Sequence, residues 1–130
     1  MSLLRRREMM ENQEQEENVI YVYNGYIGMG GHYDDIPQSS SQYPNSSATS
    51  SIPVDAGDKS VVTYTSCYQF RSRLYNSNGD YYDNQYSFNA TVSQKGYIRF
   101  VAHMGIGSFD SIKIVKPDGT EIDYKIIDMR

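Results

Sequence analysis

The sequence contains very few of the residues on which cross-linked or metal-stapled domains depend. Its 130 residues include one cysteine, two histidines and no tryptophan. The single thiol, Cys67, cannot form a disulfide within the chain. Cysteine and histidine together also fall short of the four ligands that a structural zinc ion needs. The fold must therefore rely on its own core or on partners.

Leucine and alanine, which favour helices, are equally scarce. There are three leucines and four alanines, against eight valines, eleven isoleucines and thirteen tyrosines. Val, Ile and Tyr suit a pleated, half-buried surface. The composition therefore predicts an all-β fold and disfavours helical bundles and α/β folds. A chain of this length holds one domain with a sizeable core.

Strong positive charge and long apolar runs are both missing. The net charge is −4, which does not support binding to nucleic acid. Apolar runs such as Ile98–Met104 are interrupted by charged or polar residues, whereas a membrane span needs about 20 apolar residues. The N-terminal residues include a basic cluster but no apolar segment of a signal peptide. We therefore expect a protein that is made in the cytoplasm and does not insert into a membrane.

Residues 1–18 differ in composition from the rest of the chain. Three consecutive arginines are followed by five glutamates, with few apolar residues among them. We therefore expect a short N-terminal arm that is helical or disordered, ahead of a β-domain at residues 19–130. One interpretation is a solvated tail. The other is an arm that binds a partner through Leu3, Leu4, Arg5, Arg6, Arg7, Met9 and Met10.

The rest of the chain reads as short strands separated by turns. Seven to nine strand-like segments are spaced as in an antiparallel β-sandwich, and the serine-rich stretch 32–51 reads as a loop. Asn76–Asp80 and Lys116–Thr120 carry turn residues. In residues 97–102 the alternation places Ile98 and Phe100 in the core, and Tyr97, Arg99 and Val101 outside.

Catalytic and metal-binding patterns are weak. Cys67 lies in a predicted strand, where a buried, inert thiol is the expected state. The aspartate pairs 34/35, 55/58 and 80/83 are explained by turns, and nothing selects one pair for glycoside hydrolysis. We therefore expect no catalytic residues and no cofactor. A Ca²⁺ ion at Asn76–Asp80 is the weaker alternative to a plain hairpin turn.

Tyrosine is the one residue in clear excess. A β-fold can bury only some of thirteen tyrosines with partners for their hydroxyls. Exposed tyrosines suit contacts with proteins or sugar rings, although they can also simply cover a polar sheet face. We expect a ligand-binding or interface surface that includes Tyr33, Tyr43, Tyr81 and Tyr82.

Four local motifs occur in order along the chain: Gly25–Ile27, Ile52–Asp58, Phe70–Gly79 and Ala90–Phe100. This order resembles the carbohydrate-binding-module-like β-sandwich domain of tail, fibre and other virion proteins from phages of gut Bacteroidetes, crAss-like phages included. The resemblance covers about residues 19–115. It implies an antiparallel sandwich of the jelly-roll type.

The resemblance also implies a function. It suggests a non-enzymatic structural or accessory protein of a tailed-phage virion, in the tail, baseplate or capsid. Its partners would be other virion proteins, in a homo-oligomer or a larger assembly. The alternative is a module that binds glycans on the host surface, and a hydrolase is a third, weaker interpretation.

Overall fold

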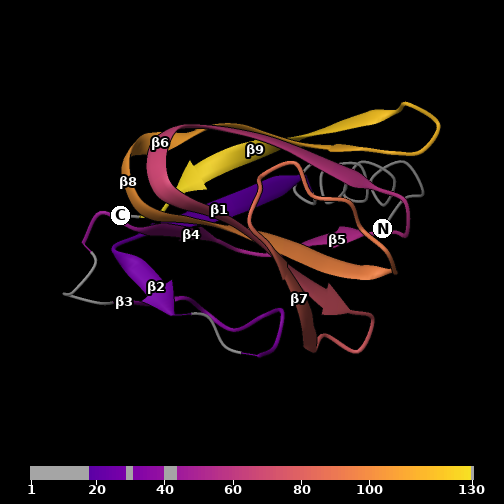
Figure 1. The fold of residues 1–130 in the computed structure, drawn as a ribbon, viewed down its shortest axis with the longest axis horizontal. Helices are drawn as coiled ribbons and strands as arrows, with labels where there is room; N and C mark the ends of the chain where they lie inside the picture. The colour runs from indigo at the N-terminus through magenta and orange to yellow at the C-terminus, as the bar shows by residue number, and fades with distance from the viewer. Residues whose placement is uncertain (1–17, 29–30, 40–43, 130) are drawn as a thin grey trace, which may run out of the picture.

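The computed structural model describes residues 18–28, 31–39 and 44–129 (Figure 1). These residues form nine β-strands and no α-helix, as the composition predicts. The predicted arm residues Leu3 to Met10 lie outside the described residues, as does Tyr43. The strands are β1 (Val19–Asn24), β2 (Tyr26–Gly28), β3 (Gln38–Ser39), β4 (Ser47–Thr49), β5 (Ile52–Val54), β6 (Lys59–Asn76), β7 (Tyr81–Gln85), β8 (Gly96–Val115) and β9 (Glu121–Asp128).

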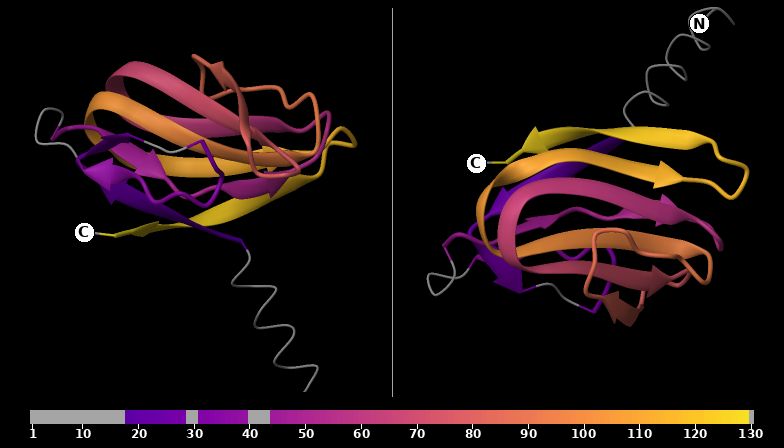
Figure 2. Two further views of the ribbon diagram at one scale, coloured as in Figure 1. Left: turned by 90° about the horizontal axis from the view of Figure 1, so that it is seen from below. Right: turned by 45° about the horizontal axis from the view of Figure 1, so that its top comes forward.

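Strands β6 and β8 form the frame of the molecule. They are antiparallel and pair from Lys59 with Val115 to Asn76 with Gly96. Figures 1 and 2 show the two strands bending together round one end of the molecule. The register shifts between Thr63 and Ser66, and Gly107 on the opposite strand has a φ of 109°. Such irregularities let a long ribbon bend without losing its pairing on either side.

The bend allows the sheet to close on itself. The second half of β8 pairs with β9, β9 with β1, β1 with β4, and β4 with the first half of β8. The all-β prediction is confirmed, but these hydrogen bonds make one closed, barrel-like sheet, not the two separate sheets expected. The pairing of β1 with β9 is also parallel, which corrects the expectation of a purely antiparallel fold.

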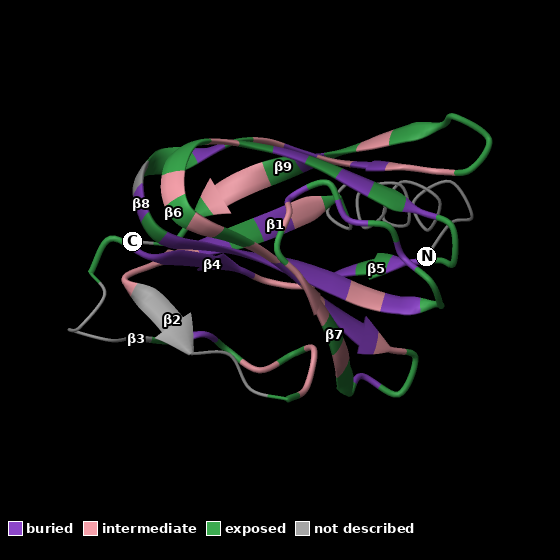
Figure 3. Cartoon of the chain, in the orientation of Figure 1, coloured by how far each residue is buried: buried purple, intermediate pink, exposed green. Residues whose placement is uncertain are grey.

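The core fills the inside of this closed sheet. Ile98 and Phe100 are fully buried, as the alternation of their strand predicts. Figure 3 shows buried and exposed residues alternating along the first residues of β6, whereas residues 98–103 of β8 are all buried. The other buried apolar residues of the cluster come from most strands and from the segment after β7: Ile20, Val22, Ile52, Val54, Val62, Leu74, Phe88, Ala90, Val92, Ala102, Phe109, Ile112, Ile114 and Tyr124.

The opposite face of β8 corrects another expectation. Arg99 and Val101 were predicted to face solvent, but both are 1% exposed. The stretch 32–51, predicted as a loop, contributes β4, which pairs with Val101 and Ala102. Small residues make this possible, because Ala48 and Thr49 are completely buried and the Thr49 hydroxyl accepts the Phe100 N–H at 3.0 Å. Both faces of this part of β8 are therefore covered.

Candidate ligand-binding pocket

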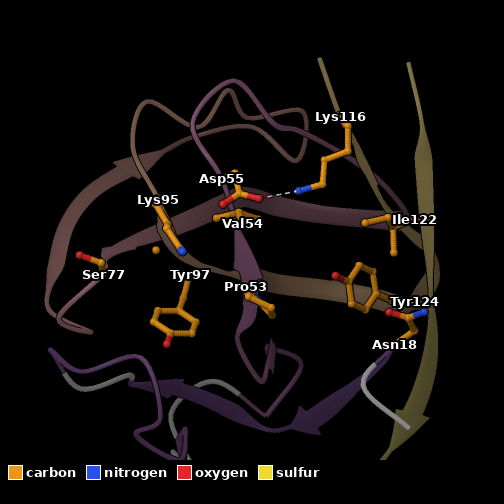
Figure 4. A pocket seen from close by; sticks show the side chains of 11 residues that line it. Asn18, Pro53, Val54, Asp55, Ser77, Lys95, Tyr97, Lys116, Ile122 and Tyr124 are labelled. Carbon is orange, nitrogen blue, oxygen red and sulfur yellow. Dashed lines mark hydrogen bonds and ion pairs between the residues drawn. The ribbon is translucent and has the colours of Figure 1, made fainter. Parts of the chain in front are cut away.

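A pocket of about 320 Å³ lies where β5, the first residues of β8, and β9 meet (Figure 4). Its volume is at the low end of the range for small-molecule sites, about 300–1,000 Å³. The lining combines apolar, aromatic and charged side chains on several elements. The residues are Asn18, Pro53, Val54, Asp55, Ser77, Lys95, Gly96, Tyr97, Lys116, Ile122 and Tyr124.

Strand pairing fixes the floor of the pocket. Pro53 lies opposite Tyr97, and Val54 opposite Gly96. Proline is tolerated here because β5 is a short strand at an edge, where its missing N–H breaks no ladder. Gly96 also pairs with Asn76, and a Cβ on Gly96 would lie 1.9 Å from the carbonyl oxygen of Tyr75. Glycine is therefore needed for β6 and β8 to approach each other beside the pocket.

An ion-pair cluster forms one side of the pocket. Lys116 Nζ donates to Asp58 Oδ2 at 2.7 Å and to Asp55 Oδ2 at 3.1 Å. Asp58 is completely buried, and its Oδ2 also accepts the Asp55 N–H at 2.8 Å. Burial lowers the pKa of Lys116, but the hydrogen bonds to the two aspartates outweigh it and raise that pKa overall. Two carboxylates thus compensate the charge of Lys116.

Lys95 forms the other charged part of the rim. Its side chain is exposed, and in Figure 4 its ammonium group extends between Tyr97 and Val54. No carboxylate among the described residues lies within ion-pair distance of it. Lys95 therefore brings an uncompensated positive charge to the pocket.

Two tyrosines face the pocket from different elements. Tyr97 stacks on Tyr33, with ring centroids 3.8 Å apart and planes 10° apart. The neighbouring Tyr97 hydroxyl raises the pKa of Tyr33. Tyr124 is buried, and this burial raises the pKa of its hydroxyl. Rigid aromatic rings of this kind bind the apolar face of a ligand at low entropy cost.

A buried arginine holds the segment that supplies Tyr33. Arg99 Nη1 donates to the carbonyls of Asp35 at 2.7 Å and Tyr33 at 3.3 Å, and Nε donates to the Thr49 carbonyl at 3.0 Å. Burial lowers the pKa of Arg99, and Tyr75 offsets part of this effect. Sequence reasoning missed this role, because alternation alone assigned Arg99 to the surface.

The predicted tyrosine surface is only partly assembled. Tyr33 and Tyr81 lie on adjacent segments, since the Tyr33 N–H donates to the Gly79 carbonyl and the Tyr81 N–H to the Gly31 carbonyl. Arg73 lies over the Tyr81 ring, 4.1 Å from its centroid. Tyr82, the next residue, packs against the core instead. Tyr33 thus contacts the pocket residue Tyr97, but Tyr33, Tyr81 and Tyr82 do not themselves line the pocket.

The other residues that were considered for catalysis or metal binding lie in turns, in partly buried positions or in local ion pairs. Asn76 Oδ1 accepts the N–H groups of Asn78 and Asp80, both at 3.0 Å, as in a plain turn. Cys67 is half-buried, and burial raises the pKa of its thiol. His32 pairs with Asp34, which raises the pKa of the imidazole. Within residues 18–28, 31–39 and 44–129, no cluster of three or more His, Cys, Asp or Glu side chains could hold a metal ion.

A second surface lies along the free edge of β6. On the edge of β6 that faces away from β8, Lys59 forms an isolated bridge with Thr91, and β7 pairs with β6 from Ser72 onward. Between these two points, the described residues provide no paired strand for the stretch 61–71. A groove of about 400 Å³ runs beside it. Its lining is largely aromatic: Val62, Thr63, Tyr64, Phe70, Tyr86, Ser87, Phe88 and Asn89. We call this surface the β6 edge groove.

Comparison with protein-family models, with curated proteins and with solved structures finds no match to this chain. The part of the chain that the structure describes contains no helix with the length and apolar character required to cross a membrane.

Proposed function

We propose that this chain is a non-enzymatic structural or accessory protein of a tailed-phage virion, which binds neighbouring virion proteins through the β6 edge groove. It would share the sandwich-derived fold of carbohydrate-binding-module-like virion domains. The observation that supports assembly by protein contacts is the unpaired edge of β6, with the aromatic groove beside it.

Natural proteins protect free strand edges with charges, prolines, covering loops or β-bulges, and of these β6 has the irregularity between Thr63 and Ser66. The unpaired stretch 61–71 contains no proline and one charged residue, Arg71, at the end next to β7. Tyr68 and Tyr86 are 78% and 65% exposed, and Phe70 is 39% exposed. An edge with this composition favours pairing with another strand, and the aromatic groove offers a place for that strand's side chains. A partner in the working assembly would remove the aggregation hazard.

The test uses particles of the phage that encodes the chain. We expect the protein in purified particles, and we expect Thr65→Lys with Tyr86→Ser to prevent its incorporation. A matched control is Thr120→Lys with Tyr21→Ser, which adds the same charge and removes another exposed ring away from this edge. Absence of the wild-type protein from particles, or normal incorporation of the edge variant, would refute the proposal.

A second candidate function is glycan binding, and the pocket of Figure 4 favours it. Tyr97 and Pro53 offer apolar faces, and Ser77, Asn18 and Lys95 offer hydrogen-bonding groups around them. The test is a glycan array probed with the full chain and with Tyr97→Ala. Tyr68→Ala is the control, because Tyr68 is exposed and does not line the pocket. Binding that depends on Tyr97 but not on Tyr68 would support this function.

A further inference from the structure

We infer that the pocket of Figure 4 selects a sugar unit that carries a carboxylate, a uronic acid, with Lys95 binding the carboxylate and Tyr97 stacking on the ring. This inference rests on the second proposed function, glycan binding. It is carried by the charge pattern of the rim and by the arrangement of the aromatic and apolar lining residues.

The rim has two lysines in different electrostatic states. Lys116 already contacts two carboxylates, at 2.7 and 3.1 Å. Lys95 has no such partner among the described residues, and its side chain extends into the space above Tyr97. An incoming anion would therefore find an available ammonium at Lys95. At Lys116 it would meet the negative charge of Asp55.

This asymmetry also sets the orientation of the ligand. Asp55 is exposed beside Lys116, so a ligand carboxylate placed there would be repelled. The carboxylate is therefore directed to Lys95, at the side of the pocket near Ser77 and Tyr97, as Figure 4 shows. The hydroxyls of the sugar then face Asn18 and Tyr124 on the opposite side, and Asp55, which lies between Lys95 and Lys116 in Figure 4, can accept hydrogen bonds from them.

Size and lining favour one ring over an extended chain. The volume of about 320 Å³ is at the small end of ligand sites. Pro53 lies between the two tyrosines, Tyr97 and Tyr124, and Val54 and Ile122 add apolar surface above them in Figure 4. The C–H face of a pyranose can lie on such a surface while its substituents reach the polar rim. The stack of Tyr97 on Tyr33 holds the Tyr97 ring in place before binding.

The experiment compares two monosaccharides that differ in one group, methyl β-glucuronide and methyl β-glucoside. Binding to the full chain is followed by ligand-observed NMR and by chemical-shift titration. We expect the uronate to bind about two- to fivefold more tightly than the neutral sugar, as for an ion pair at an exposed lysine. Added salt should reduce this preference.

Two lysine variants separate the role of Lys95 from a general charge effect. Lys95→Met should abolish the preference for the uronate, and Lys95→Arg should retain most of it. Lys113→Met is the matched control, since Lys113 is a partly exposed lysine of β8 that does not line the pocket. A preference that survives Lys95→Met would overturn the assignment of Lys95.

The outcomes distinguish selectivity for a carboxylate from glycan binding itself, on which this inference rests. Equal binding of the two sugars, both lost in Tyr97→Ala, would overturn the carboxylate selectivity and leave glycan binding in place. Failure of both monosaccharides to bind would overturn the inference, and the glycan array would then decide on glycan binding by itself. A uronate preference that is lost in Lys95→Met and kept in Lys113→Met would support it.

Discussion

The guanidinium of Arg99 donates a hydrogen bond of 2.7 Å to the backbone carbonyl of Asp35. The two residues are far apart in sequence, and this bond fixes a segment that has few strand contacts of its own. Arg99 donates to the backbone carbonyls of Tyr33, Asp35 and Thr49, and these carbonyls solvate the buried cation. Through the same segment, Arg99 determines where Tyr33 lies against Tyr97 and hence the shape of the pocket wall.

Replacing Arg99 with methionine should reduce the free energy of unfolding by about 2–4 kcal/mol. The methionine fills much of the space, but the carbonyls of Tyr33, Asp35 and Thr49 lose a charged donor. Urea denaturation measures the loss. The Tyr33–Tyr97 stack should also loosen, which NMR of the aromatic protons would detect. A change below about 0.5 kcal/mol would show that Arg99 does not hold this segment.

Truncation of Phe100 tests the core assignment. Phe100 is completely buried in the centre of the cluster. Phe100→Ala should therefore cost about 3–5 kcal/mol in a denaturant melt. Phe70→Ala is the matched control, because Phe70 is 39% exposed and should lose clearly less. A loss below about 1 kcal/mol for Phe100→Ala would contradict the inward orientation of this strand.

Sequence patterns predicted the structure correctly where it depends on composition, on alternation within one strand or on the residues of one turn. The excess of Val, Ile and Tyr predicted an all-β chain, and the alternation at Ile98 and Phe100 predicted the core. The turn residues of Asn76–Asp80 and Lys116–Thr120 predicted two turns, which the backbone hydrogen bonds Gly79 N to Asn76 O and Gly119 N to Lys116 O confirm. Each of these features depends on residues close together in the sequence.

Features that depend on distant pairing could not be predicted in this way. The closure of the sheet requires β1 to lie between β4 and β9, and nothing local specifies that order. The same pairing covers Arg99, so the alternation rule failed for that residue. The pocket was not predicted either, because Pro53, Lys95 and Tyr124 come together only when the sheet closes. Tyr33 was predicted as a ligand-binding residue from composition, but Tyr97 was not singled out.

Lys116 and Asp58 form an ion pair in which the carboxylate of Asp58 is buried, and a substitution at Lys116 removes the cation of this pair. Lys116→Met leaves the carboxylate of Asp58, 0% exposed, without its cation. We expect a loss of about 2–4 kcal/mol in urea denaturation at neutral pH. In the same background, Asp58→Asn should restore part of the stability because a neutral amide is buried at lower cost.

The control for this pair is Lys113→Met. Lys113 contacts Glu121 at 3.8 Å and Asp123 at 3.7 Å on an exposed surface. Exposed pairs contribute little, so the change should stay within about 0.5 kcal/mol. Equal losses of unfolding free energy in Lys113→Met and Lys116→Met would show that the buried pair of Lys116 and Asp58 contributes no more than an exposed pair.

His103 should make the protein less stable in mild acid. Burial lowers the pKa of His103, and Arg71 lowers it further. The unfolded chain, with a histidine pKa of about 6.5, therefore binds a proton more readily than the folded one. Stability should fall as the pH drops below about 6.5, and His103→Asn should weaken this dependence in urea melts at several pH values.

His32 provides a contrast of opposite sign. The hydrogen bond to Asp34 raises the pKa of His32 above its usual value. Its contribution to stability is therefore present below the unfolded pKa and is lost as the pH rises through the folded pKa. His32→Asn should make the acid-dependent loss slightly larger. A smaller acid-dependent loss in His32→Asn, or an unchanged one in His103→Asn, would contradict this assignment of the two histidines.

Removal of the N-terminal arm tests the remaining prediction from the sequence. The carbonyl of Asn18 accepts the Lys125 N–H at 2.9 Å, so the deletion should cover residues 1–17 and keep Asn18. The deleted residues combine three arginines, five glutamates and few apolar side chains. A segment of this composition would order only against a partner, which must supply the free energy that ordering costs. The melting temperature of the truncated chain should therefore stay within a few degrees of the full chain, while its incorporation into phage particles is lost.

Replacing Arg5, Arg6 and Arg7 with glutamine should weaken incorporation in the full-length chain, whereas glutamine at Glu14, Glu16 and Glu17 is the matched charge control. Normal incorporation of the truncated protein would make the arm a solvated tail and would leave the β6 edge groove as the attachment surface.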